Sequence, residues 1–406
     1  MSLTDLQREM LANEICVHLK KTITPDLAAD IVKQGAYISP DIVSVKIEGN
    51  ALRCEVRSGA DMATLQDKVE RFADMMVSLY RRMPAKVLHT RSRVDQAPLE
   101  TNVYRKLIDK GWVKELGRGQ VGLAGPALKA FWAIDADCRN LGREAFSATD
   151  EVYPTLIPSS TLARCGYFSS FPQNVSMVTH LVEDIDAIEA FRRANPDGTG
   201  LTVPDHGALT IPEACLSPAV CYHCYRGLEG MSLSDGPRVT TAVGKCFRYE
   251  STNINGLDRL WDFTMREVIF VGTFDEVSSR RERGIELVKA QLDKWDLQAQ
   301  IETANDPFFS ATYAAKRFHQ VQSDLKFEVR ATIEPDDDGP RTLACASFNL
   351  HEDFFGRTFE ITASNGQPAF TGCLAWGLER WVLALFTQHG LTPERWPEAL
   401  RATVWC

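Results

Sequence analysis

The apolar positions of the first 95 residues follow two different periods. Residues 42–56 alternate between apolar and polar side chains around Glu48-Gly49-Asn50, which predicts two strands joined by a tight turn. Residues 61–83 carry apolar side chains at helical spacing after an initial aspartate, and residues 4–20 show a similar period. These elements predict a small α/β domain over residues 1–95.

The rest of the chain, residues 96–406, has the pattern of one larger mixed domain. Hairpin-like breaks separate its strands, which favours an antiparallel sheet flanked by helices, an α+β fold, over a doubly wound parallel sheet. We expect helices at 101–111, 125–142, 274–296 and 373–390, the last ending at Gly390, and strands at 245–250, 261–272, 326–333 and 343–350.

Composition narrows the class of protein. Of the 406 residues, 44% are hydrophobic and 24% charged, as in ordinary folded domains, and the net charge of −9 does not favour nonspecific binding to nucleic acid. No apolar run is long enough to span a membrane, so we expect no membrane partner. The eleven cysteines, with no secretory signal in the first residues, favour the reducing cytoplasm and free thiols or metal ligands.

A basic segment separates the two predicted domains. Residues 81–93 include Arg81, Arg82, Lys86, Arg91 and Arg93. One interpretation is a solvated linker, and the other is a contact strip for an acidic partner.

The stretch "CFRYESTNINGLDRLWDFTMREVIF" (246–270) carries candidate chemistry. Side chains two apart on a strand share a face, so Arg248 and Glu250 are predicted to point the same way, with Glu267 on the following strand. The planar fork of an arginine suits phosphate oxygens, and a neighbouring glutamate can accept a hydrogen bond from an amine. The alternative is an ion pair on a solvated face.

A second candidate is Arg380 in "GLERW" (377–381), close to the predicted start of an apolar helix. Small residues just before it, such as Gly377, permit close approach of a ligand, and a helix start attracts phosphate charge. An ordinary helix with one surface Glu–Arg pair is the alternative.

Together, an F-R-x-E strand, a loop, a returning strand and a distant G-L-E-R helix resemble motifs 2 and 3 of class II aminoacyl-tRNA synthetases. In that family the motif 2 arginine holds the α-phosphate of ATP and the motif 3 arginine holds the γ-phosphate. The resemblance therefore implies catalytic, ATP-binding roles for Arg248 and Arg380, with Glu250 near the adenine or the motif 2 loop. "EVYPTLIPSS" is similar to motif 1, with Pro158 at the dimer interface, which implies a homodimer.

Cys221, Glu267 and Cys373 resemble the zinc ligands of methanogenic-type seryl-tRNA synthetases and of their relatives, the amino acid:[carrier protein] ligases. Two thiolates and one carboxylate leave Zn²⁺ an open fourth position, which the substrate's α-amino group fills in those families. Glu267 would thus also bind substrate. The alternatives are that the three residues are merely buried, or that "CYHC" (221–224) is half of a structural zinc knuckle.

Further segments resemble the carrier-protein ligases in particular. By this resemblance, Ser347 and Asn349 lie on the strand before motif 3 and face the substrate pocket, Ser347 near ATP, while Lys326 and Glu328 also line it. The alternative is that these side chains only fill the sheet. The matching segments are 166–172, 304–309, 325–329, 344–356 and 396–405.

The resemblance implies a two-step reaction. A small amino acid (glycine, alanine or serine) is activated with ATP and Mg²⁺ to an aminoacyl-adenylate, and the acyl group passes to the phosphopantetheine thiol of a carrier protein. The alternative acceptor is tRNA, as in the seryl synthetases. A non-catalytic paralogue is a third possibility, which the presence of both Arg248 and Arg380 disfavours.

Residues 1–95 depart from both families. The carrier-protein ligases lack an extension of this size, and the seryl enzymes have a larger tRNA-binding domain. The extension could bind tRNA, dock a carrier protein or serve dimerisation.

Overall fold

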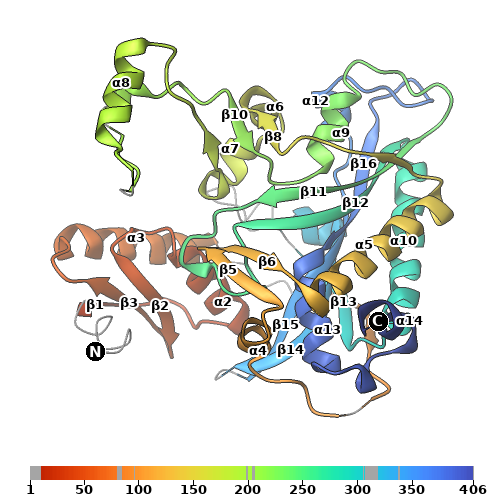
Figure 1. Ribbon diagram of the computed structural model, residues 1–406, viewed down its shortest axis with the longest axis horizontal. Coiled ribbons are helices and arrows are strands. Elements are labelled where there is room, and N and C mark those ends of the chain that lie inside the picture. Colours follow the sequence, from red (N-terminus) through yellow and green to blue (C-terminus); the bar gives the residue numbers. More distant parts are fainter. Residues whose placement is uncertain are drawn as a thin grey trace.

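The computed structural model describes residues 11–79, 85–95, 97–197, 200–203, 206–304, 306, 319–336 and 339–405. Its N-terminal unit is a three-stranded antiparallel sheet, in the order β1-β3-β2, covered by two helices (Figure 1). The core of this unit holds apolar side chains from all five elements. Its elements are β1 (Leu11–His18), α2 (Pro25–Gly35), β2 (Ile42–Glu48), β3 (Ala51–Arg57) and α3 (Met62–Leu79).

The N-terminal hairpin and the α3 helix agree with the sequence pattern, but the helix predicted over 4–20 is wrong. Residues 11–18 form β1, which pairs with β3, while residues 4–10 lie outside the described residues. Ile15 and Leu19 are buried and the side chains between them are more exposed, so the strand period of two also fits. A sequence this short fits both the helical period and the strand period, and pairing with the β2–β3 hairpin favours the strand.

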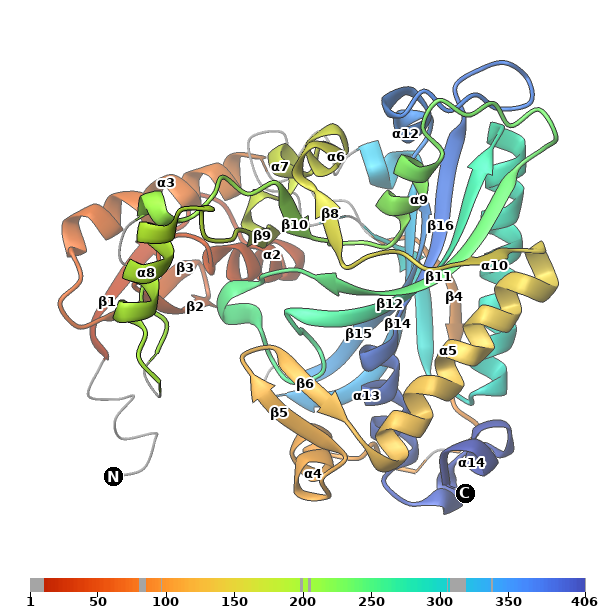
Figure 2. The same cartoon turned by 45° about the horizontal axis from the view of Figure 1, so that its top comes forward.

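The second unit is built on an eight-stranded sheet in the order β4-β13-β14-β15-β16-β12-β11-β7. Figure 2 labels its central strands β14, β15, β16, β12 and β11. Every neighbouring pair is antiparallel except β7 and β11, which are parallel. This confirms the predicted α+β class. The strands are β4 (Val87–Arg91), β7 (Thr149–Glu151), β11 (Arg238–Phe247), β12 (Asp262–Gly272), β13 (Ala299–Thr303), β14 (Lys326–Asp336), β15 (Gly339–Leu350) and β16 (Phe370–Gly377).

Long helices cover one face of this sheet. Alternate residues of each strand point to them, so Val268 and Phe270 of β12 join the main core while Glu267 and Ile269 face the other side. A capping box between Thr273 and Glu276 fixes the start of α10. The helices on this side are α4 (Val103–Asp109), α5 (Gly125–Phe146), α10 (Phe274–Lys294), α13 (Leu378–His389) and α14 (Glu398–Trp405).

The remaining elements are short, and the hairpin of β5 (Val113–Gly117) and β6 (Gln120–Leu123) packs against the same core as the long helices. The glycines of residues 117–122 match G-x-G-x-x-G, yet they lie in the β5–β6 hairpin and not between a strand and a helix. These elements are β5 (Val113–Gly117), β6 (Gln120–Leu123), β8 (Leu156–Pro158), β9 (Met177–Val178), β10 (Ala214–Leu216), α6 (Ser159–Arg164), α7 (Tyr167–Ser170), α8 (Ile185–Ala194), α9 (Cys221–Gly227) and α12 (Phe354–Thr358), with short 3-10 turns at 172–174, 206–208, 251–253 and 393–395.

Two element boundaries in the second unit differ from the prediction. The first part of the helix expected at 373–390 is strand β16, because this strand is buried on both faces and shows no alternation. Arg380 still lies in the first turn of the helix that follows. Strand β11 ends at Phe247, so Arg248 and Glu250 follow the strand instead of sharing one of its faces.

The basic segment is not a solvated linker. Its residues 87–91 form β4, the edge strand of the large sheet, so this sheet begins before the boundary expected at residue 95. Lys86 pairs with Asp324, Arg91 pairs with Asp293 and Asp296, and the guanidinium of Arg93 donates to backbone carbonyls. These cations therefore bind their own chain, whereas Arg81 and Arg82 lie outside the described residues.

Among the described residues, no helix is both long and apolar enough to cross a membrane. The ten described cysteines are all free thiols, in agreement with the expectation against disulfides.

Candidate active site

One cavity of about 220 Å³ opens on the face of the large sheet that the long helices leave free. It is lined by every catalytic, substrate-binding or metal-binding residue that the sequence predicted, although these residues come from distant parts of the chain. Those lining residues are Cys221, Arg248, Glu250, Glu267, Lys326, Glu328, Ser347, Asn349, Cys373 and Arg380.

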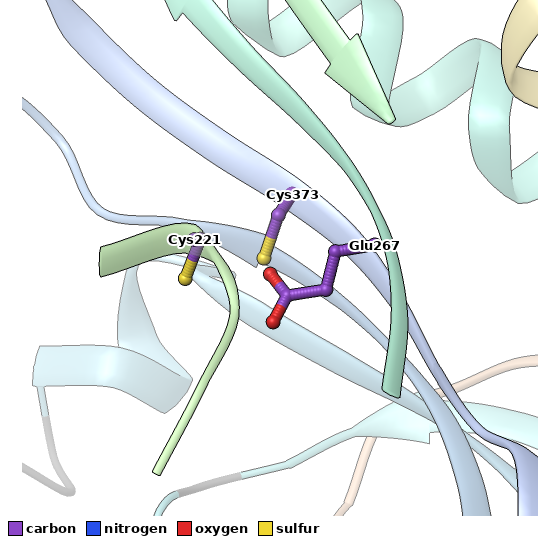
Figure 3. Close-up of side chains that lie close together, drawn as sticks. All are labelled: Cys221, Glu267 and Cys373. Atoms are coloured by element: carbon purple, nitrogen blue, oxygen red, sulfur yellow. The ribbon is translucent and has the colours of Figure 1, made fainter. Parts of the chain in front are cut away.

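Cys221, Glu267 and Cys373 converge at one end of the cavity (Figure 3). One ligand atom from each lies within 4.8 Å of the other two, and all three residues are buried. Cys373 on β16 pairs with Ile269 of β12, so Glu267, two residues along β12, projects from the same face of the sheet. Cys221 reaches them from the first position of α9.

The bonding of these three groups fits a divalent cation. Glu267 Oε1 accepts a hydrogen bond from the Val220 N–H at 2.9 Å, but the buried Oε2 has no partner among the described residues. Burial, together with Cys373, raises the pKa of Glu267 to about 8. A hydrogen bond to Cys373 and burial also raise the pKa of Cys221. Two thiols and a carboxylate suit Zn²⁺, whose positive charge would reverse these shifts.

The structure does not support half of a zinc knuckle in "CYHC". In the described part of the chain, only Cys221, Glu267 and Cys373 form a group of three residues that could hold a metal ion. Cys224 is a buried thiol, and burial lowers the pKa of His223 to about 4. Cys224 is therefore a core thiol beside the site, and His223 is a half-buried side chain next to it.

Arg248 lies further along the cavity, directly after β11. Its Nε donates to the Pro218 carbonyl at 3.1 Å, and its guanidinium sits 5.5 Å from the centre of the Phe263 ring. Its terminal nitrogens make no hydrogen bond within the described ranges, so they are available to an anionic ligand.

Arg380 approaches the same region from α13. Its guanidinium donates to the backbone carbonyls of Asp258 at 2.8 Å and Ala344 at 2.9 Å, which fixes its orientation. Burial and the nearby Arg259 lower its pKa. A buried cation beside another cation gains most from a negatively charged ligand.

Glu250 is paired with Arg259 at 2.5 Å. Burial would raise the pKa of Glu250, but Arg259, Lys33 and Arg380 outweigh it and lower this pKa to about 2. The carboxylate therefore stays charged at every physiological pH and can accept hydrogen bonds from an amine.

The floor of the cavity is formed by β14 and β15. Lys326 pairs with Asp306 at 2.6 Å and with Glu328 at 3.0 Å. Asn349 donates to Ser347 Oγ at 3.0 Å and to Cys373 Sγ at 3.3 Å, which links the floor to the thiol group. These side chains face a cavity and do not only fill the sheet, but their roles toward substrate remain predictions.

Sequence reasoning missed several lining or neighbouring residues. Arg259 stands within the quoted stretch 246–270, and its place in a loop between two sheet strands was a usable signal. Asp306 and Tyr167 lie in segments that matched the ligases without being singled out, and most of residues 304–309 fall outside the described residues. His351, which lies beside the thiols, stands in the matched segment 344–356 and was not singled out either.

Comparison with known proteins gives the relatives of the chain. Amino acid–[acyl-carrier-protein] ligase 1 of Bradyrhizobium diazoefficiens is 34% identical over 274 residues, covering 66% of this chain and 78% of that protein. Ligase 2 of the same organism is 36% identical, covering 61% of this chain and 72% of that protein. Type-2 serine–tRNA ligase of Methanopyrus kandleri is 27% identical, covering 72% of this chain and 58% of that protein. No family model matches the chain.

Solved structures agree on the fold. The M. kandleri seryl-tRNA synthetase, solved with A. aeolicus tRNASec, has a TM-score of 0.66 at 22% identity, covering 96% of this chain and 77% of that one. The Pyrococcus horikoshii seryl-tRNA synthetase solved with ATP has a TM-score of 0.55 at 13% identity, covering 84% and 79%. The chain therefore belongs to the family of the amino acid–[acyl-carrier-protein] ligases, which share the class II fold of the seryl-tRNA synthetases.

Proposed function

We propose that this protein activates a small amino acid with ATP and transfers it to the phosphopantetheine thiol of a carrier protein. One observation carries the proposal: a single cavity joins a thiol–thiol–carboxylate cluster at one end to two arginines, Arg248 and Arg380, at the other. The relationship to the Bradyrhizobium ligases supports this choice of acceptor.

The amino acid would occupy the end formed by Cys221, Glu267 and Cys373. Zn²⁺ held by these residues would supply a Lewis acid for the substrate's α-amino group. Asn349, bonded to Cys373, orients that thiol. The substrate would be glycine, alanine or serine, as the family resemblance implies.

In the first step, a carboxylate oxygen of the amino acid attacks the α-phosphorus of ATP, and pyrophosphate leaves. Arg248 and Arg380 stabilise the negative charge that develops on the phosphate oxygens, and ATP brings Mg²⁺ with it. Glu250 and Ser347 line the part of the cavity where the nucleotide would lie. In the second step, the thiol attacks the acyl carbonyl, and AMP leaves.

A second candidate function is aminoacylation of tRNA. The type-2 serine–tRNA ligases are more distant relatives than the carrier-protein ligases, yet they match a larger share of this chain. A ribose hydroxyl would then replace the thiol.

We also propose a homodimer, as the motif 1 resemblance at Pro158 implies, which light scattering at micromolar concentration would test.

The decisive experiment offers both acceptors to the enzyme. Protein, ATP, Mg²⁺ and labelled glycine, alanine or serine are incubated with bulk tRNA, or with a carrier protein that carries phosphopantetheine. Label on the carrier protein that neutral hydroxylamine releases supports the ligase function. The same carrier protein without its phosphopantetheine is the matched control and should stay unlabelled. Label on tRNA alone would contradict the proposal.

A further inference from the structure

The N-terminal unit is docked onto the connection between β11 and β12, residues 248–261, which carries Arg248, Glu250 and Arg259. Figure 2 shows this turn beside α2. The contacts come from the end of the helix and the residues that follow it: Asn253 Nδ2 donates to the Lys33 carbonyl at 2.8 Å, Ser251 Oγ to the Ala36 carbonyl at 3.2 Å, and Tyr37 Oη to the Tyr249 carbonyl at 3.3 Å and to Asn174 Oδ1 at 3.4 Å.

This docking places Lys33 near the part of the cavity that holds the arginines, although Lys33 is not itself among the lining residues. The charged groups around its ammonium are Arg259 and Glu250 of the connection, Glu328 of β14 and Asp30 of its own helix. Two of them, Glu250 and Glu328, line the cavity. The ammonium makes no hydrogen bond or ion pair with any residue that the structure describes.

An ammonium in this position lacks a partner of its own. Glu250 is already paired with Arg259, and Glu328 with Lys326. Burial and the repulsion of Arg259 lower the pKa of Lys33 to about 8, so the nearby carboxylates compensate its charge poorly. An anionic ligand would compensate the charge of Lys33. Under the proposed function, the triphosphate of ATP is the anion that binds beside it.

We propose that Lys33 is a nucleotide-binding residue, through which the N-terminal unit supplies a cation to the phosphates of ATP held by Arg248 and Arg380. The inference rests on the proposed function for the identity of the anion. It gives residues 11–79 a direct part in the nucleotide site: docking of α2 completes the site and holds the connection that carries three of its charged residues.

The test is the affinity of the full chain for ATP, measured by calorimetry without amino acid. Lys33→Ala is expected to weaken binding about 10-fold, the effect of one charge-assisted hydrogen bond. Lys33→Arg should keep the affinity, and Lys46→Ala is the matched control, because this exposed lysine of the same unit pairs with Glu55 and with no other residue that the structure describes. Equal affinity of wild type and Lys33→Ala would overturn the inference.

A pH series separates phosphate binding from a structural role. Bound phosphate raises the pKa of Lys33, so its contribution is complete below pH 8 and is lost as pH rises above 8. The ATP affinity of wild type should fall in that range more than that of Lys33→Arg, whose charge persists. ATP binding that depends on Lys33, in a protein that activates no amino acid, would contradict the proposed function and leave this inference intact.

Discussion

At one end of the cavity, Cys221, Glu267 and Cys373 bring together three groups that can each carry negative charge. At the other end, Arg248, Arg380 and the Glu250–Arg259 pair place cations and an anion side by side. We call these the thiol end and the arginine end. The thiol end is built for a ligand that brings positive charge, and the arginine end for one that brings negative charge.

The two ends also differ in what supports them. Glu267 and Cys373 project from adjacent strands in the middle of the large sheet, so the sheet ladder sets their spacing. Arg248 and Glu250 lie in a connection, which other segments must hold in place. The comparison teaches that the sheet fixes the spacing of two of the three proposed metal ligands, whereas the proposed nucleotide site depends on contacts made by the connection, including those from α2.

The largest expected effect comes from the thiol end. Cys373→Ser should lose bound zinc and reduce amino-acid-dependent pyrophosphate exchange by more than about 100-fold, since even the indirect partners of a metal contribute 10- to 100-fold. Metal content by mass spectrometry and exchange are measured together. Cys224→Ser is the matched control, a buried thiol outside the cluster that should keep its zinc. Full activity of a zinc-free Cys373→Ser protein would refute the ligand assignment.

At the arginine end, Arg248→Ala should lower the exchange rate by about 10²–10³-fold while zinc content stays unchanged, because the substitution removes a donor to the charge that develops on the α-phosphate. Arg238→Ala serves as the control, because Arg238 begins β11, the strand that precedes Arg248, and pairs with Glu151. If Arg248→Ala released the metal, the two ends would not be independent, and the comparison would fail.

A smaller effect concerns stability. The pKa of Glu250 is about 2 in the folded protein and about 4.5 when unfolded, so its ion pairs stabilise the fold above pH 5 and are lost as pH falls toward 2. Glu250→Gln should therefore lower the free energy of unfolding by up to about 3 kcal/mol at pH 7. Denaturant unfolding at pH 7 and pH 3 measures this. A difference between the two proteins that does not shrink at pH 3 would contradict the assigned cause.

The motif residues were predictable because each lies in a short sequence pattern that is typical of a phosphate-binding role. "FRYE" and "GLER" indicated Arg248 and Arg380, and the fold brings them into one cavity with Cys221, Glu267 and Cys373. The spacing of apolar residues could not locate β16. This strand is buried on both faces, so it has no alternation of apolar and polar residues to distinguish it from the helix that follows. Lys33 could not be found from the sequence, because only docking of the N-terminal unit places it beside residues more than a hundred positions away. Asp306 stands in a segment that matched the ligases, but its pairing with Lys326 appears only in the folded structure.

The lengths of the strands in the large sheet bear on solubility. The five strands from β14 to β11 have eight to twelve residues, whereas the outermost strands, β7 and β4, have three and five. A long open edge offers unpaired backbone groups to another chain and promotes aggregation. Because β4 is short and its Arg91 is tied to Asp293 and Asp296, the broad apolar sheet ends in edges that resist the addition of a foreign strand.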